Sequence, residues 1–124
     1  MAFTDHQLAQ YNAFGFVLLR GLLDAQEMAA FTLEFERGLA RAHSVMTRHG
    51  NRKQLNWSNL SPESPCLGAL LEDARFVGGA EQLFGTVVGH YANSNSFDAS
   101  QTEWHSDTDD LRRRGVKFAF YLQP

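Results

Sequence analysis

The sequence predicts an α+β domain in which the helices come before the strands. In the first part of the chain, apolar residues recur at spacings of three and four and follow capping signals, as in amphipathic helices. After Gly85 the pattern changes to short apolar or alternating runs typical of strands. The chain has 124 residues, 44% of them apolar and ten of them Phe, so it can form one core. We expect a single domain over residues 1–124, helical to about residue 85 and strand-forming from about residue 86.

The first predicted helix begins with a capping box. Thr4 is followed three residues later by Gln7, a spacing at which each side chain can bind the other residue's backbone N–H group. The apolar residues with helical spacing stop at Gly15, and we expect the helix to end there because glycine commonly ends helices. The brief apolar run Phe16–Leu19 follows, and its length and composition predict a short strand.

A long amphipathic helix is predicted next. Asp24 and Glu27 repeat the capping-box spacing at its start, and the helical pattern continues to His49 and Gly50. Its apolar stripe consists of Met28, Phe31, Phe35, Leu39, Ala42 and Val45. The charged residues predicted to lie on its solvated outer face are Glu34, Glu36, Arg37, Arg41 and Arg48. Gly38 lies within this helix, where glycine costs about 1 kcal/mol relative to alanine.

The middle of the chain predicts shorter elements. Asn51–Leu60 is polar with Leu55 and Trp57 alternating, which indicates a short strand or an ordered loop. A short helix is then predicted over Cys66, Leu67, Leu70 and Leu71. Another helix begins after Asp73, a candidate N-cap, and closes at Gly85.

In the last third of the chain, the spacing of apolar residues changes from the helical period to the shorter period of strands. Thr86–Asn95 is predicted to be a strand, Phe97–Thr102 a polar turn, and Val116–Leu122 a buried strand.

Charge and composition exclude several classes of partner. The net charge is −3, and the compact basic run Arg112–Arg114 directly follows three aspartates, which argues against nucleic-acid binding. No apolar run approaches the roughly 20 residues of a membrane span, and the first residues do not resemble a signal peptide. Cys66, the lone cysteine, cannot form an internal disulfide, which suits a reducing compartment. We expect a cytoplasmic protein that binds neither nucleic acid nor membrane.

The segment Glu103–Asp110 carries the residues with the clearest chemical potential. In an extended segment, residues two apart point to the same side, so His105 and Asp107 can converge on one ion. Imidazole and carboxylate are the ligands of non-haem Fe(II) sites in which two histidines and one carboxylate occupy one face. The pair would supply two members of such a triad.

Other interpretations of this segment remain open. His105 and Asp107 could be ordinary surface residues of a loop. The aspartates of this part of the chain could bind Ca²⁺ or Mg²⁺: Asp98, Asp107, Asp109 and Asp110. However, the segment lacks the acid spacing, the glycine and the final glutamate of an EF-hand loop. A hydrolytic zinc site would lack the usual His-Glu-x-x-His pattern.

The order of the motifs adds a family resemblance. A helix ending in LFG is followed by HYANSNSF, WHSD and VKFAFYLQP, and the chain opens with GFVLLRGLLDAQE before its long helix. This order resembles the N-terminal half of the phytanoyl-CoA dioxygenase-like family of Fe(II)- and 2-oxoglutarate-dependent oxygenases. WHSD is the most specific of these motifs. The resemblance implies helices packed on the first strands of a double-stranded β-helix, which is a jelly-roll or cupin-like fold.

The resemblance also implies roles for individual residues. His105 and Asp107 would be iron ligands, and Asn95 would contact 2-oxoglutarate with Asn93 and Tyr91 as its neighbours. Trp104 would either lean over the substrate pocket or serve in packing. The implied reaction is hydroxylation of a small organic molecule with Fe(II), 2-oxoglutarate and O₂.

The sequence departs from the family in one respect. Family members carry a second histidine ligand, and a basic residue that pairs with 2-oxoglutarate, well downstream of the His-x-Asp pair, whereas residues 108–124 contain no histidine. We therefore expect the chain to be the N-terminal portion of a longer oxygenase. The alternative is an inactive remnant or a small binding module that reuses half the fold and self-associates through an open sheet edge.

Overall fold

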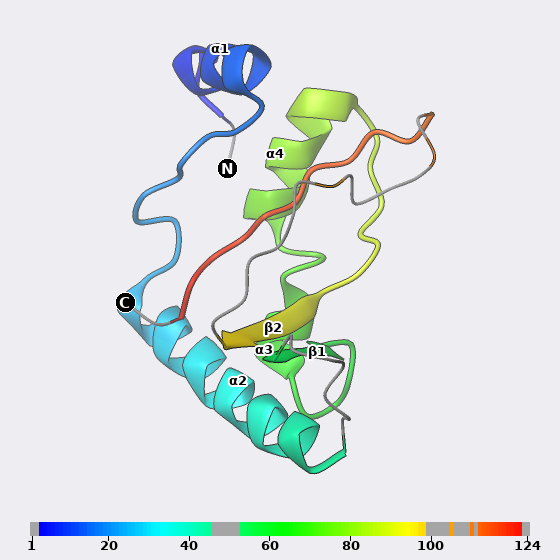
Figure 1. The fold of residues 1–124 in the computed structure, drawn as a ribbon. Helices are drawn as coiled ribbons and strands as arrows, with labels where there is room; N and C mark the ends of the chain where they lie inside the picture. The colour runs from blue at the N-terminus through cyan, green and yellow to red at the C-terminus, as the bar shows by residue number, and fades with distance from the viewer. Residues whose placement is uncertain (1–2, 46–52, 99–104, 106–109, 111, 123–124) are drawn as a thin grey trace.

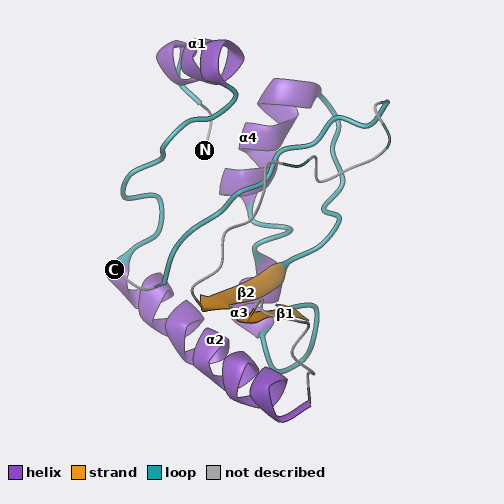
Figure 2. Ribbon diagram, viewed as in Figure 1, coloured by secondary structure: helices purple, strands orange, loops and turns teal. Residues whose placement is uncertain are grey.

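The computed structural model describes residues 3–45, 53–98, 105, 110 and 112–122. Its elements follow the order α1, α2, β1, α3, α4 and β2 (Figures 1 and 2). The α+β class is therefore confirmed, but the predicted order of helices before strands is not, because β1 lies between α2 and α3. Within the described ranges, no helix is both long and apolar enough to cross a membrane.

The capping boxes predicted for the first two helices are present. In α1 (Asp5–Phe14), the Gln7 N–H group donates to Thr4 Oγ1 at 3.3 Å and the Thr4 N–H group donates to Gln7 Oε1 at 2.9 Å. The helix ends at Gly15, whose φ of 77° is a left-handed conformation that favours glycine.

The second helix, α2 (Ala25–Val45), is capped in the same way. The Glu27 N–H group donates to Asp24 Oδ1 at 2.8 Å, and the Asp24 N–H group donates to Glu27 Oε2 at 2.9 Å. Local side-chain chemistry therefore determines where these two helices begin.

Two further helices complete the helical part of the fold. The short helix α3 (Pro65–Ala69) and the helix α4 (Ala74–Phe84) agree with the predicted positions. Asp73 caps α4 by accepting a hydrogen bond from the Arg75 N–H group at 2.8 Å, and Gly85 closes it.

Arg75 joins the beginnings of α2 and α4. Its guanidinium lies 2.6 Å from both Glu27 and Asp73 and donates to the Leu22 carbonyl oxygen at 3.0 Å. Hydrogen bonds from Arg75 hold the pKa of the Glu27 and Asp73 carboxyl groups below their usual values. The guanidinium fork thus connects the N-cap residue of α4 with the capping-box glutamate of α2, which is far from it in the sequence.

The sheet has two antiparallel strands, β1 (Lys53–Ser58) and β2 (Asn93–Asp98). The predicted alternation in β1 is confirmed: Leu55 is buried and Trp57 half-buried, facing α2. Asn56 points to the opposite, exposed face. The sheet therefore has one face packed on a helix and one open face.

Two of the predicted strands differ from the structure. One of them is not a strand at all, and the other begins later than predicted. Phe16–Leu19 is irregular, and the Phe16 side chain is 63% exposed, because no strand of the described residues lies beside this segment. Thr86–Asn95 becomes a strand only at Asn93, where pairing with β1 begins, and β2 continues through Phe97 into the predicted polar turn. The rest of that turn lies outside the described residues.

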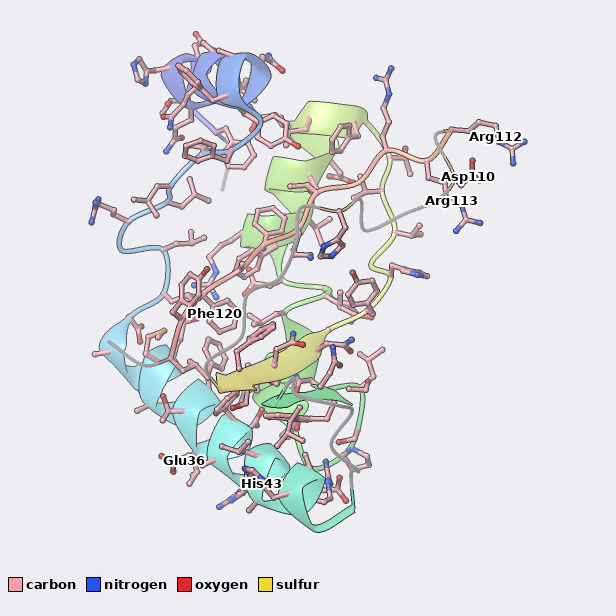
Figure 3. The ribbon with its side chains drawn as sticks, in the orientation of Figure 1. Glu36, His43, Asp110, Arg112, Arg113 and Phe120 are labelled. Atoms are coloured by element: carbon pink, nitrogen blue, oxygen red, sulfur yellow. The ribbon has the colours of Figure 1, made fainter. Side chains whose placement is uncertain are left out.

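The predicted strand Val116–Leu122 is also not a strand, because no described strand lies beside it. Its burial nevertheless alternates with a period of two, as in an extended segment packed on one side. The Phe118 ring lies 5.0 Å from Phe76 in α4. The Phe120 ring lies 5.7 Å from Phe31 in α2, and Figure 3 shows Phe120 above that helix. This segment thus contributes to the core through its side chains.

Candidate functional site

The predicted site residues lie just before, within or after β2 in the sequence. His105 is described and exposed, whereas Asp107 and Trp104 lie outside the described residues. Asn93 and Asn95 occupy alternate positions of β2 and are both exposed on the open face of the sheet. Tyr91 precedes the strand and is 48% exposed, with its ring against His90 at 5.3 Å. The structure therefore brings the two asparagines together on one face.

The open face carries a cross-strand amide pair. Asn56 in β1 lies directly opposite Asn95 in β2. The Asn56 side-chain amide donates to Asn95 Oδ1 at 2.7 Å. Cross-strand partners on one face are close enough for such a contact, so the register of the sheet sets which side chain Asn95 meets.

A buried polar pair fixes the other face of the same strand. Ser94 and Asn59 are both buried, and their side chains exchange hydrogen bonds of 3.0 and 3.1 Å. The Asn59 N–H group also donates to the Ala92 carbonyl oxygen at 2.8 Å. Because buried polar groups are costly without partners, these bonds favour the orientation that leaves Asn93 and Asn95 outward.

Helix α2 supports the sheet through a close approach at Gly38. The Trp57 ring lies 5.1 Å from Phe35, and Trp57 Nε1 lies only 2.2 Å from where a Cβ atom on Gly38 would be. A glycine at position 38 is therefore required for the contact between α2 and Trp57, whereas the sequence indicated only a glycine that the helix tolerates. Among the described residues, Trp57 Nε1 has no hydrogen-bond partner.

The prediction that Glu34 lies on the solvated face of α2 is wrong, because its side chain is buried. Its two carboxylate oxygens accept hydrogen bonds from the backbone N–H groups of Cys66 and Leu67, each at 2.9 Å. It thereby satisfies the first N–H groups of α3 from a different helix. A hydrogen bond to Glu34 and burial raise the pKa of the Cys66 thiol.

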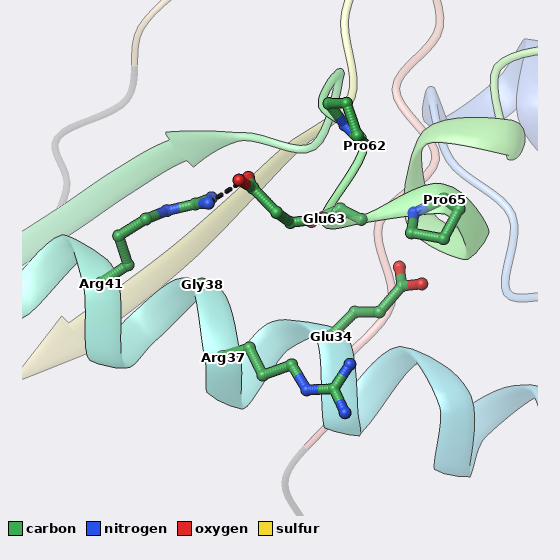
Figure 4. A pocket seen from close by; sticks show the side chains of 8 residues that line it. Glu34, Arg37, Gly38, Arg41, Pro62, Glu63 and Pro65 are labelled. Atoms are coloured by element: carbon green, nitrogen blue, oxygen red, sulfur yellow. Dashed lines mark hydrogen bonds and ion pairs between the residues drawn. The ribbon is translucent and has the colours of Figure 1, made fainter.

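A pocket of about 360 Å³ lies between α2 and the loop before α3 (Figure 4). Its lining includes Glu34, Arg37 and Gly38, and Arg41 forms an ion pair with Glu63 across it. Of the predicted iron and 2-oxoglutarate residues that the structure describes, none lines this pocket. Its carboxylates are already bound to protein groups, so it does not resemble a prepared ligand site.

The alternative Ca²⁺ or Mg²⁺ site includes Asp110, and arginine side chains already bind the carboxylate of this residue. Asp110, the aspartate of that set whose side chain is described, accepts hydrogen bonds from Arg112 and lies 3.4 Å from Arg113. Figure 3 shows the three residues together at the outer end of their loop. Arg112 keeps the pKa of Asp110 below its usual value. Within the described residues, no three His, Cys, Asp or Glu side chains gather as a metal site.

Comparisons with known proteins give one kind of relative. The chain is 30% identical to the protein named ectoine dioxygenase from Bordetella bronchiseptica in an alignment 115 residues long, which covers 86% of this chain and 37% of the relative. The ectoine dioxygenase of Bordetella parapertussis gives the same identity and coverage. No family model matches the chain, and no solved structure gives a significant match. The chain thus spans little more than a third of the length of these relatives, and the similarity points to dioxygenases.

Proposed function

We propose that this chain is part of an Fe(II)- and 2-oxoglutarate-dependent dioxygenase that hydroxylates a small organic molecule. The observation that carries the proposal is the 30% identity to two ectoine dioxygenases over 86% of the chain. The His-x-Asp pair supports it from the sequence, since imidazole and carboxylate suit non-haem iron.

The proposal assigns His105 and Asp107 to the iron and makes neither of them an acid or a base. When bound, Fe(II) and 2-oxoglutarate would supply the oxidising power needed to place an oxygen atom of O₂ into a C–H bond. The donor types fit Fe(II), and His105 is exposed. Because Asp107 provides a carboxylate where halogenating relatives carry a small residue, the assignment favours hydroxylation.

The open face of the sheet would bind the co-substrate. Asn95 would contact 2-oxoglutarate, with Asn93 and Tyr91 beside it. These side chains are exposed and uncharged, so they can bind a dicarboxylate by hydrogen bonds while other residues supply positive charge. Trp104 would lie beside the substrate pocket. The relatives' name makes ectoine the first substrate to test.

The test is Fe(II)-dependent conversion of 2-oxoglutarate to succinate by the protein expressed from its complete reading frame. We expect His105→Ala or Asp107→Ala to lower this turnover and iron affinity by roughly 100-fold or more, because loss of a residue that merely hydrogen-bonds to a metal ligand already costs about 10- to 100-fold. His43→Ala is the matched control, because His43 is exposed on α2 and is not a predicted ligand.

Two outcomes would contradict the proposal in different ways. Unchanged iron binding in both ligand variants would show that the ligand assignment is wrong. A wild-type protein that binds neither Fe(II) nor 2-oxoglutarate would support the inactive remnant or binding module instead.

A further inference from the structure

The hydrogen bond between Asn56 and Asn95 has a defined direction. The donor is Asn56 Nδ2 and the acceptor is Asn95 Oδ1, at 2.7 Å. A primary amide has one carbonyl acceptor and two N–H donors. The bond therefore occupies the acceptor end of Asn95. Within the described part of the chain, Asn95 Nδ2 has no hydrogen-bond partner.

The backbone leaves Asn95 little other freedom. It is paired in register with Asn56, and its neighbour Ser94 is anchored to Asn59 by two buried hydrogen bonds. The exposed side chain can still rotate, and rotation of the terminal amide would exchange its oxygen and nitrogen. An unpartnered exposed amide can adopt both orientations, whereas the bond from Asn56 favours the one with the nitrogen free.

We propose that Asn56 is a positioning residue that aims the Asn95 NH₂ group at an oxygen of 2-oxoglutarate. The inference rests on the proposed function, because it takes Asn95 as a contact for that co-substrate. A carboxylate only accepts hydrogen bonds, so an amide that presents its oxygen would repel it. Asn56 therefore acts on binding through Asn95 and touches no ligand itself.

The decisive variant is Asn56→Asp, which keeps the size of the side chain but cannot donate when ionised. The aspartate would accept from Asn95 and turn the Asn95 oxygen toward the ligand. We expect the Kd of 2-oxoglutarate to rise about 10-fold or more, the effect of one hydrogen bond to a charged group. Asn56→Ala, which only frees the amide, should give a smaller rise.

The measurement is calorimetric titration of 2-oxoglutarate into the Fe(II)-loaded protein from the complete reading frame. A double-mutant cycle separates positioning from general damage: in an Asn95→Ala background, Asn56→Asp should add no further loss. The control for the added charge is Ser58→Asp. Ser58 lies on the same face of β1 but opposite Asn93, and aspartate can still accept the hydrogen bond from the Leu60 N–H group.

The outcomes of these titrations separate the positioning role of Asn56 from the proposed function. Wild-type binding with an unchanged Kd in Asn56→Asp overturns the positioning role alone. Equal losses in Asn56→Asp and Ser58→Asp, or a full further loss in the Asn95→Ala background, overturn it as well. A wild-type protein that does not bind 2-oxoglutarate overturns the positioning role together with the proposed function.

Discussion

The helical region, residues 3–45 and 65–85, and the C-terminal region, residues 86–122, are held together by different kinds of interaction. In the helical region, most helix ends are set by residues within four positions of them, as at Thr4, Asp24 and Asp73. In the C-terminal region, β2 is a strand only where β1 lies beside it, and the extended segment 116–122 relies on rings from two helices.

The difference shows which parts of the chain have a structure determined by nearby residues and which depend on distant ones. A cap is a short-range device that operates wherever its residues occur. A strand requires a partner that can be distant in the sequence. The candidate site lies in the second kind of region, so its geometry depends on the scaffold that the first kind provides.

The largest effect should come from the ring contact that joins the two regions. Phe76 is buried in α4 and Phe118 packs on it from the C-terminal segment. We expect Phe76→Ala to lower the free energy of unfolding by about 3–5 kcal/mol, and Phe118→Ala by less, because Phe118 is only half-buried. Chemical denaturation measures both variants.

Tyr121→Ala is the control, because this side chain is 87% exposed and should change stability by no more than about 0.5 kcal/mol. Equal losses in the Phe76→Ala and Phe118→Ala variants would mean that the C-terminal segment is as deeply integrated as the helices. The contrast between the regions would then fail.

A smaller loss is expected at the contact between α2 and β1. Gly38→Ala places a methyl group against the Trp57 indole, and overpacking of this kind costs roughly 1–3 kcal/mol. Alanine would otherwise stabilise the helix by about 1 kcal/mol. Adding Trp57→Phe removes the atoms nearest to the new methyl group, so the double variant should recover stability relative to Gly38→Ala. If Gly38→Ala is stabilising by itself, the close approach is not present in solution.

The smallest effect concerns Glu34 and the thiol that it contacts. Glu34→Gln retains one acceptor for α3 but leaves the other N–H group facing an amide, which should cost about 1 kcal/mol. The same change removes the carboxylate that raises the pKa of Cys66, so the thiolate fraction and the alkylation rate at pH 8 should rise. Iodoacetamide labelling measures this rate.

The matched control is Glu36→Gln, which removes an exposed carboxylate from the same helix (Figure 3). It should change neither stability nor labelling. Slower labelling in Glu34→Gln would reverse the expected sign and contradict the contact with the thiol.

Sequence patterns predicted the helices well because their caps and stripes are local. The same patterns misplaced Glu34, since a charged residue beside Arg37 is expected in solvent and nothing nearby reveals that α3 needs a carboxylate. They also gave Gly38 no role, because Trp57 reaches it from a strand outside the helix. Phe16–Leu19 has the composition of a strand, but no strand in the described ranges pairs with it.

The candidate site was predictable to a similar degree. The family resemblance named Asn93 and Asn95 as neighbours, which alternation in a strand allows, and the structure places both on the exposed face of β2. The cross-strand partner of Asn95 could not be inferred, because the register between β1 and β2 depends on burial of Leu55 and Trp57 against α2. The metal-ligand assignment of His105 and Asp107 stays a prediction.

The alternating burial of residues 116–122 has a consequence for how this region can vary. Phe118 and Phe120 contact two different helices from one side of the segment, so an insertion or deletion of one residue between them would turn one ring away from its helix. A change of two residues would preserve the sides. Length changes inside this extended segment are therefore constrained by their parity, whereas a surface loop can absorb an added residue.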